Sequence, residues 1–317
     1  MQQLDQSPVG PEEIDSLGHL NVRFYLARVD RANRVLLNAL GLGVSALETQ
    51  AATLRRIDTY CKFRREQFEG ADLTVHGGVL QTTGAQVRCY YEIRNAARDE
   101  IAATFVTGTI MADRTSRQLL ELPLSARQVN EQYGVQIPTY AQPRSLSLDP
   151  PRLDIPFTTL MERIGESVEF GMTGRREGMI EASDCGPDGV LRDDVELMFV
   201  MFRKQMEQME QMDVKAFGPP VQHTDEGHRF AWAMLETRNI EVTRPRAGDA
   251  VVWIGADVGI AEKSRQSRRW AFVKNTGQLL SIHDSVGIAM DLDARRAIVI
   301  PRSIRETMDR HYLPEFG

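Results

Sequence analysis

Apolar residues recur at helical spacing soon after the start of the chain and then at strand-like spacing. The helical positions are Val22, Tyr25, Leu26, Val29, Ala32, Val35, Leu36 and Leu40, and Gly41 then supplies a C-terminal stop. This spacing predicts an amphipathic helix over about 22–40. Strand-like runs follow near 55–68, 72–82, 86–95 and 100–112. The pattern predicts a long helix followed by an antiparallel sheet.

The second half of the chain repeats this order. A helix with a methionine-rich apolar stripe is expected near 194–212, and strand-like runs follow near 229–243, 249–261, 268–275 and 279–291. Three landmarks align the halves: Gly18 with Gly189 (189 − 18 = 171), Asp72 with Asp249 (249 − 72 = 177) and Gly108 with Gly287 (287 − 108 = 179). The slow drift of the offset indicates an internal duplication. Two unrelated α+β domains with the same element order are the alternative.

Prolines gather between the two halves, at positions 123, 138, 143, 150, 151 and 156, with little periodicity around them. This segment, 123–156, is predicted to connect a first domain over 1–122 to a second over 157–317. A length of 317 residues with 42% hydrophobic content is sufficient for two cores.

Charge and cysteine content narrow the functional classes. The net charge is −6 and acidic and basic residues are interspersed, which is not the pattern of a nucleic-acid-binding protein. The first residues lack the pattern of a signal peptide, and no apolar run approaches the roughly 20 residues that span a bilayer. The three cysteines, Cys61, Cys89 and Cys185, form no Cys-x-x-Cys pair. We therefore expect a cytoplasmic protein without disulfides, metal or cofactor; Cys61 is either a small buried residue or a nucleophile.

Candidate chemistry gathers where the first helix begins. Asp15, His19 and Asn21 directly precede the predicted helix. Unpaired backbone N–H groups and the positive end of the helix dipole lie at such a position, and both suit a developing oxyanion. The structural alternative is that Asp15 caps the turn and His19 merely lies in it.

The pattern Asp-x-x-x-His-x-Asn-x-x-x-Tyr, formed by Asp15, His19, Asn21 and Tyr25, resembles the helix-entry motif of hotdog-fold thioesterases. The resemblance is to the 4-hydroxybenzoyl-CoA thioesterase-like group, particularly bacterial long-chain acyl-CoA thioesterases and the two-domain acyl-ACP thioesterases of plants. Phe63-Arg64-Arg65-Glu66-Gln67 is similar to a strand segment of the plant enzymes whose glutamate is assigned a catalytic role. The register there is open, because Gln67 or Glu69 fits the position of Glu66 as well.

The resemblance implies an α+β tandem (double) hotdog fold, in which each half is an antiparallel sheet wrapped around a long helix. It implies that Asp15 or Glu66 acts as general base or nucleophile and that His19 and Asn21 orient base and water. We expect the backbone N–H groups from Gly18 to Leu20 to polarise the thioester carbonyl, with Tyr25 nearby. Candidate ligands for the phosphates of coenzyme A are Arg64, Arg65, Arg265, Arg268 and Arg269.

The motif departs from the family in two respects. Leu17 stands where the plant enzymes have an asparagine, and the motif lies in the first half, whereas in the plant enzymes it lies in the second. The equivalent stretch of the second half has Gly186, Val190 and Arg192 in place of the aspartate, histidine and asparagine. The sequence thus predicts one working and one degenerate site.

The predicted function is hydrolysis of an acyl-CoA thioester, with acyl-ACP as a further substrate class. The alternatives are a hotdog hydratase or dehydratase acting on acyl-CoA, and a non-catalytic acyl-CoA-binding module. The predicted partner is the thioester substrate, not a nucleic acid or a membrane. Association into a homo-oligomer of double-hotdog protomers is left open, because hotdog sheets often associate further.

Overall fold

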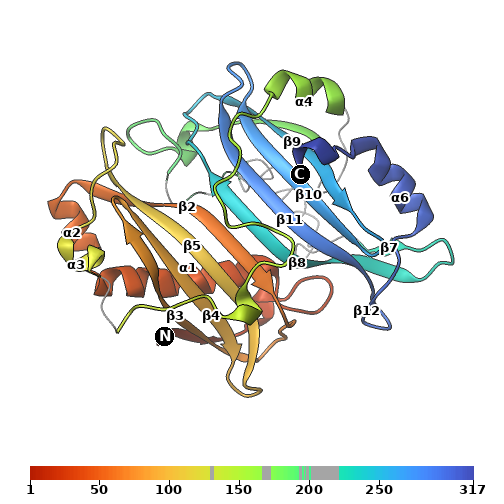
Figure 1. Cartoon of the computed structure of the whole chain (residues 1–317), viewed down its shortest axis with the longest axis horizontal. Coiled ribbons are helices and arrows are strands. Elements are labelled where there is room, and N and C mark those ends of the chain that lie inside the picture. Colours follow the sequence, from red (N-terminus) through yellow and green to blue (C-terminus); the bar gives the residue numbers. More distant parts are fainter. Residues whose placement is uncertain (129–131, 166–172, 193–194, 196, 198–199, 201–220) are drawn as a thin grey trace. The chain divides into compact units, whose positions relative to one another are not determined.

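A computed structural model describes the chain except for residues 129–131, 166–172, 193–194, 196, 198–199 and 201–220. The described residues divide into two compact units, one up to Arg144 and one from Ser145 onward (Figure 1). The boundary falls within the predicted connecting segment 123–156. No helix in the described part of the chain is both long and apolar enough to cross a bilayer.

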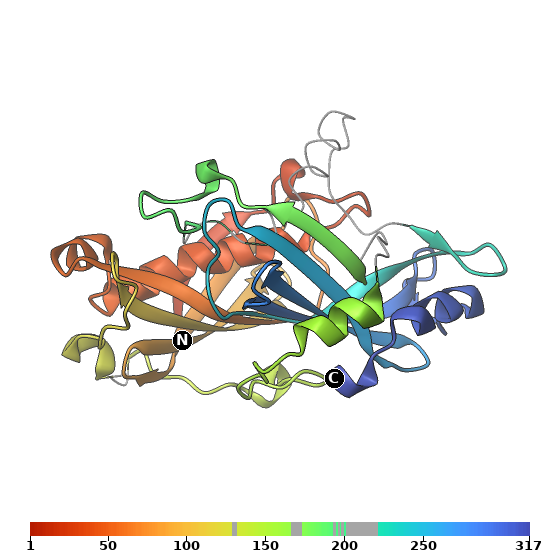
Figure 2. The ribbon, with the colours of Figure 1, turned by 90° about the horizontal axis from the view of Figure 1, so that it is seen from above.

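The first unit is an antiparallel sheet packed against one long helix. Its strands are β1 (Gln2–Pro8), β2 (Ala52–Phe63), β3 (Asp72–Thr83), β4 (Gln86–Asn95) and β5 (Glu100–Asp113), in the order β1-β3-β4-β5-β2. Its helices are α1 (Val22–Ala39), α2 (Val44–Thr49) and α3 (Leu124–Arg127), with 3-10 turns at Pro11–Glu13 and Thr139–Ala141. Figures 1 and 2 show α1 lying along one face of this sheet. The predicted helix and four strands are therefore present; β1, which is mostly polar, is additional.

The core of the first unit lies between α1 and the sheet. Tyr25, Val29, Ala32 and Leu36 of the helix are buried against strand residues such as Val75. Two positions of the predicted apolar stripe lie outside this core: Val22 and Val35 are each 50% exposed. The buried face instead includes Leu37 and, unexpectedly, Arg28. The buried face thus differs from the predicted one at its edges, and an ion pair with Glu13 allows Arg28 to lie within it.

The second unit repeats the same strand order. Its strands are β6 (Gly174–Met179), β7 (Gln222–His223), β8 (Arg229–Glu241), β9 (Ala250–Ile260), β10 (Ser264–Val273), β11 (Leu279–Asp291) and β12 (Arg296–Ala297). The order β6-β9-β10-β11-β8 matches β1-β3-β4-β5-β2. Its helices are α4 (Phe157–Ile164) and α6 (Arg302–Met308), with 3-10 turns at Ala182–Asp184, Asp309–His311 and Pro314–Phe316. The predicted helix near 194–212, with its methionine stripe, lies largely outside the described residues.

The duplication extends to individual backbone hydrogen bonds. In the loop Asp15–His19, the N–H of Asp15 donates to the oxygen of His19 (2.9 Å), and Gly18 donates back to Asp15 (3.0 Å). The same two bonds recur in the loop Gly186–Val190, each at 2.9 Å, at an offset of 171 (186 − 15). Both glycines that close these turns, Gly18 and Gly189, have positive φ, which L-residues with a side chain adopt reluctantly. This shared loop confirms the alignment of Gly18 with Gly189.

Equivalent residues of the two sheets are separated by a larger number of residues than those of the two loops. Arg64 and Arg65 donate their N–H groups to the oxygen of Ala102, and Val242 and Thr243 donate theirs to Leu280, an offset of 178 (280 − 102). At this offset Asp249 corresponds to Ala71 (249 − 71 = 178), so the predicted alignment of Asp72 with Asp249 is wrong by one residue. A turn bond supports the correction, because Ala71 N–H donates to Phe68 O and Asp249 N–H donates to Arg246 O.

The connecting segment is bound to the sheets on either side of the boundary. In the first unit, the Tyr140 hydroxyl donates to Glu92 and Lys62 Nζ donates to the oxygen of Gln142 (2.7 Å). In the second, the N–H groups of Ser145 and Leu146 donate to Glu236 Oε2, each at 3.2 Å. Pro-rich composition therefore marks irregular backbone that is nonetheless held in place.

Candidate functional site

The loop before α1 is shaped by Asp15 and closed by Asn21. Asp15 Oδ1 accepts the N–H of Leu17 (2.9 Å) and lies 3.5 Å from the N–H of His19. Asn21 is the N-cap of α1, where its Oδ1 accepts the N–H of Arg23 (3.1 Å). Asp15 therefore performs the capping role that was its structural alternative, and Asn21 caps the helix as well. The second carboxylate oxygen of Asp15 remains for His19.

His19 lies between two carboxylates. Its Nδ1 is 3.2 Å from Asp15 Oδ2, and its Nε2 is 3.7 Å from Glu66 Oε1. The side chain of Asp15 is only 4% exposed, whereas that of Glu66 is 35% exposed. The structure thus brings together three of the four predicted catalytic side chains, and among these Glu66 is the carboxylate that a solvent molecule reaches most easily.

Glu66 follows the end of β2 and is not part of a strand. The predicted strand 55–68 in fact ends at Phe63, and irregular backbone leads to the turn before β3. Of the two alternatives for this position, Gln67 is buried with its amide bonded to Asn95, and Glu69 is exposed. Of these three side chains, Glu66 is the one that lies beside His19 in the structure.

The backbone and tyrosine assigned to the oxyanion are engaged within the protein. Gly18 N–H donates to Asp15 O, and Leu20 N–H donates to Gln67 O (2.7 Å). The Tyr25 hydroxyl donates to Arg65 O (3.3 Å), and its ring packs edge-on against Phe63. The bond of Gly18 closes the loop itself, and those of Leu20 and Tyr25 connect the loop and α1 to the segment around Glu66. The bonded N–H groups of Gly18 and Leu20 do not fit the predicted role of polarising a carbonyl.

The five candidate phosphate ligands fall into two groups. Arg64 and Arg65 are exposed directly before Glu66, and Arg64 donates to Tyr140 O (2.9 Å). The others lie on β10 in the second unit: Arg265 pairs with Asp257 (2.7 Å), Arg268 pairs with Asp284 (2.6 Å), and Arg269 is buried. Burial, with Arg265 and Arg176 nearby, lowers the pKa of Arg269 to about 10. Arg64 and Arg65 are therefore the two that solvent reaches readily.

The corresponding loop of the second unit keeps its backbone but not its chemistry. Gly186 and Val190 occupy the places of Asp15 and His19, as the sequence predicts, and Arg244 occupies that of Glu66 (244 − 66 = 178). Arg244 donates to the carbonyl oxygens of Arg192 and Val195, the latter at 3.1 Å. A cation whose side chain is 7% exposed thus contacts backbone carbonyls, where the first unit places a carboxylate against an imidazole.

Cys61 does not have the environment of a nucleophile. It is buried on β2, and burial raises the pKa of its thiol well above the ordinary value. A nucleophilic cysteine requires the thiolate. The interpretation as a small buried residue therefore fits Cys61.

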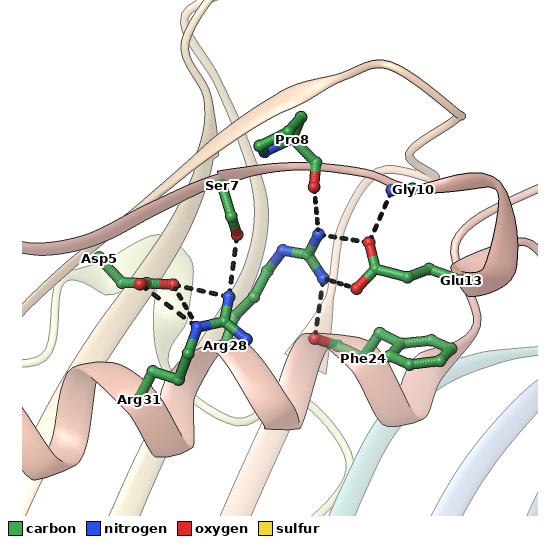
Figure 3. Close-up of polar contacts among 8 residues, drawn as sticks. All are labelled: Asp5, Ser7, Pro8, Gly10, Glu13, Phe24, Arg28 and Arg31. Atoms are coloured by element: carbon green, nitrogen blue, oxygen red, sulfur yellow. Dashed lines mark hydrogen bonds and ion pairs between the residues drawn. The ribbon is translucent and has the colours of Figure 1, made fainter.

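Sequence reasoning missed a buried ion pair that holds this loop on α1 (Figure 3). Arg28, only 1% exposed, donates from Nη1 and Nη2 to the two carboxylate oxygens of Glu13, at 2.8 and 2.7 Å. The same guanidinium donates to the oxygens of Pro8 (3.0 Å) and Phe24 (3.2 Å). Since Glu13 is two residues from Asp15, the pair fixes the start of the loop that carries Asp15 and His19. An arginine on an otherwise apolar helix face is the signal that could have revealed it.

A surface cavity of about 510 Å³ lies elsewhere on the first unit. It is lined by residues of β3, of the end of β4 and of the β4–β5 turn, with others from the start of the chain; among them are Thr74, His76, Arg94 and Asp99. Neither His19 nor Glu66 contributes to it. The candidate site is therefore identified by the side chains of the loop and not by this cavity.

Comparison with known family models places the first part of the chain in a described superfamily. Residues 9–131, which contain the loop, α1 and the whole run from β2 to β5, match the thioesterase-like superfamily. This match confirms the resemblance, and the predicted class of thioester hydrolase agrees with it. No curated protein sequence matches the chain.

Solved structures confirm the tandem hotdog fold. A protein named as an oleoyl thioesterase from Lactobacillus plantarum aligns with a TM-score of 0.59 at 10% identity, over 90% of this chain and 94% of that one. An acyl-ACP thioesterase from Bacteroides thetaiotaomicron gives 0.57 at 9%, over 89% and 96%. The 12:0-ACP thioesterase from Umbellularia californica gives 0.59 at 9%, over 90% and 93%. At such low identity the likeness establishes the fold alone.

Proposed function

We propose that this chain hydrolyses an acyl thioester, with acyl-CoA as the preferred substrate, at the site formed by Asp15, His19 and Glu66. The observation that carries the proposal is the imidazole of His19 between two carboxylates, within a domain of the thioesterase-like superfamily. Structural neighbours include proteins named as acyl-ACP thioesterases, so an acyl-ACP is the second substrate class.

Glu66 is the general base in this proposal. It takes a proton from a water molecule whose oxygen attacks the thioester carbonyl carbon. Collapse of the tetrahedral intermediate breaks the C–S bond, and Glu66 returns the proton to the sulfur, so that a carboxylic acid and a free thiol leave. Asp15, bonded to His19 Nδ1, orients the imidazole, and the imidazole in turn holds the Glu66 carboxylate. Since both Asp15 oxygens already have partners, Asp15 serves as an orienting anion.

The oxyanion requires a donor that the loop has not already used. Val22 N–H is the first amide of α1, and it makes no hydrogen bond among the residues that the structure describes. Such first-turn amides lie at the positive end of the helix dipole. We assign the polarisation of the carbonyl to this amide in place of those of Gly18 and Leu20.

Purified protein is expected to release free thiol from at least one acyl-CoA when short, long and aromatic acyl chains are screened with a thiol-reactive dye. Crotonyl-CoA serves as the discriminating substrate, because a hydratase adds water to its double bond without releasing thiol. Thiol release identifies a hydrolase. Water addition, or tight binding of acyl-CoA without turnover, would refute the proposal in favour of a hydratase or a binding module.

Arg64 and Arg65 are proposed to bind the phosphates of coenzyme A. Replacing both with methionine should raise KM for acyl-CoA about tenfold, the effect of losing roughly 1.4 kcal/mol of binding, and leave kcat nearly unchanged. The effect should diminish in high salt, which screens exposed charges. The control is Arg127→Met, which removes another exposed arginine of the same unit. An unchanged KM in the double variant would remove these arginines from the substrate site.

A further inference from the structure

Glu66 stands in irregular backbone, so no ladder of strand hydrogen bonds holds it. β2 ends three residues before it, at Phe63, and β3 begins only at Asp72. Its carboxylate is nevertheless directed at His19 Nε2. A catalytic group requires a fixed geometry, and a displacement of about 1 Å is sufficient to cost a hundredfold in rate. Side chains must therefore fix the segment.

A buried pair of amides lies directly beside it. Gln67 is 1% exposed and Asn95 is 4% exposed. Asn95 Nδ2 donates to Gln67 Oε1 (2.8 Å), and Asn95 Oδ1 accepts the N–H of Arg98 (3.2 Å). Gln67 Nε2 lies 3.4 Å from Arg65 O and 3.5 Å from Glu100 Oε1. The side-chain nitrogen and oxygen of both amides thus form hydrogen bonds, and such bonds offset the cost of burying polar groups.

This pair connects three parts of the first unit around Glu66. The backbone oxygen of Gln67 accepts Leu20 N–H from the loop before α1. Its side chain connects it to Asn95 at the end of β4, and to the carbonyl of Arg65 on the other side of Glu66. Arg65 O also accepts the hydroxyl of Tyr25 from α1. Both neighbours of Glu66 are therefore anchored, and Glu66 itself is left to face His19.

We infer that Gln67 and Asn95 are positioning residues for the reaction: they hold the Glu66 carboxylate against His19 without touching the substrate. This inference rests on the proposed function and adds residues that the sequence motif does not include. It also explains why Gln67, which the sequence leaves as an alternative to Glu66, is an amide directed away from His19.

Two variants test this role. Asn95→Asp preserves shape but removes the donor to Gln67, and Gln67→Met preserves length but removes the amide. Each is expected to lower kcat about 10–100-fold with KM changed less than about twofold, because the supporting contacts and not the substrate contacts are lost. Tyr25→Phe, which deletes one hydroxyl bond to Arg65 O in an otherwise unchanged shape, should lower kcat in the same direction. It keeps the test available if the amide variants do not fold.

A double-mutant cycle separates positioning from general destabilisation. If Asn95 acts through Glu66, Asn95→Asp should lower kcat in the wild type and have almost no effect in a Glu66→Gln background. A purely structural residue would lower kcat equally in both. The matched control is Tyr91→Phe, which removes a different hydrogen bond of the first unit, from β4 to Asn33 Oδ1 on α1 (2.6 Å), and should leave kcat unchanged.

The outcomes distinguish this inference from the function on which it rests. A wild-type protein that hydrolyses no thioester overturns the proposed function, and the positioning role with it. A wild-type hydrolase whose Asn95→Asp, Gln67→Met and Tyr25→Phe variants keep the wild-type kcat overturns only the positioning role. Equal losses of kcat in the wild-type and Glu66→Gln backgrounds overturn it as well.

Discussion

Replacing Glu66 with glutamine is expected to lower kcat for thioester hydrolysis by about 10²–10⁴-fold, the range that a positioned general base supplies. The amide keeps the size of the side chain but cannot accept the proton from water. KM should change little, because substrate binding does not depend on this proton transfer. Steady-state kinetics on the best substrate of the acyl-CoA screen measures both constants.

Glu69 provides a matched control for this variant. It is an exposed glutamate three residues further along the same irregular segment and makes no contact with His19. Glu69→Gln should therefore retain wild-type kcat. Asp15→Asn should lower kcat strongly as well, since His19 loses the anion that orients it. Full activity in both Glu66→Gln and Asp15→Asn would exclude the proposed site.

Replacing Arg28 with methionine is expected to destabilise the first unit by about 3–5 kcal/mol, the usual cost of removing one partner of a buried ion pair. The variant leaves Glu13 without its bidentate partner and removes the guanidinium hydrogen bonds to the oxygens of Pro8 and Phe24 (Figure 3). Chemical denaturation followed by far-UV circular dichroism measures the loss. All three tryptophans lie in the second unit, so their fluorescence provides an internal reference for that unit.

Arg31→Met is the control, because Arg31 lies one turn further along α1 and is 39% exposed in its ion pair with Asp5. An exposed pair contributes only about 0–1 kcal/mol. Equal destabilisation by Arg28→Met and Arg31→Met would contradict the assigned importance of burial.

The same pair predicts how stability responds to acid. Burial alone raises the pKa of Glu13, but hydrogen bonds from Arg28 and from Gly10 N–H outweigh it, so the pKa is lowered. A carboxyl group with a lowered pKa stabilises the folded state above its ordinary pKa, and this contribution is lost as the pH falls through the lowered value. The destabilisation caused by Arg28→Met should accordingly shrink in acid.

The candidate site could be predicted in part because its motif is local. Asp15, His19 and Asn21 lie within seven residues, and the glycine and helix pattern around them predicts a helix entry. Glu66 is 47 residues from His19 (66 − 19), and sequence spacing left it undecided among three residues. Its selection depends on how β2 ends and on which side chain of the segment is buried, and these are properties of the folded unit.

The sequence by itself determined the helix α1, the main strands of both halves and the duplication, because periodic burial on a helix or a sheet leaves a periodic pattern of apolar residues. It also identified the helix-entry motif and its loss in the second half. Only the tertiary structure decided that Glu66 is the residue after β2 that contacts His19. It also showed that the N–H groups of Gly18 and Leu20 are already hydrogen-bonded, and that Arg244 is the residue of the second unit that corresponds to Glu66. It alone revealed the ion pair of Arg28 with Glu13 and the amide pair of Gln67 with Asn95. Such polar partners are distant in sequence and follow no period, so they are specified only when the backbone brings them together and burial makes an unpaired polar group costly.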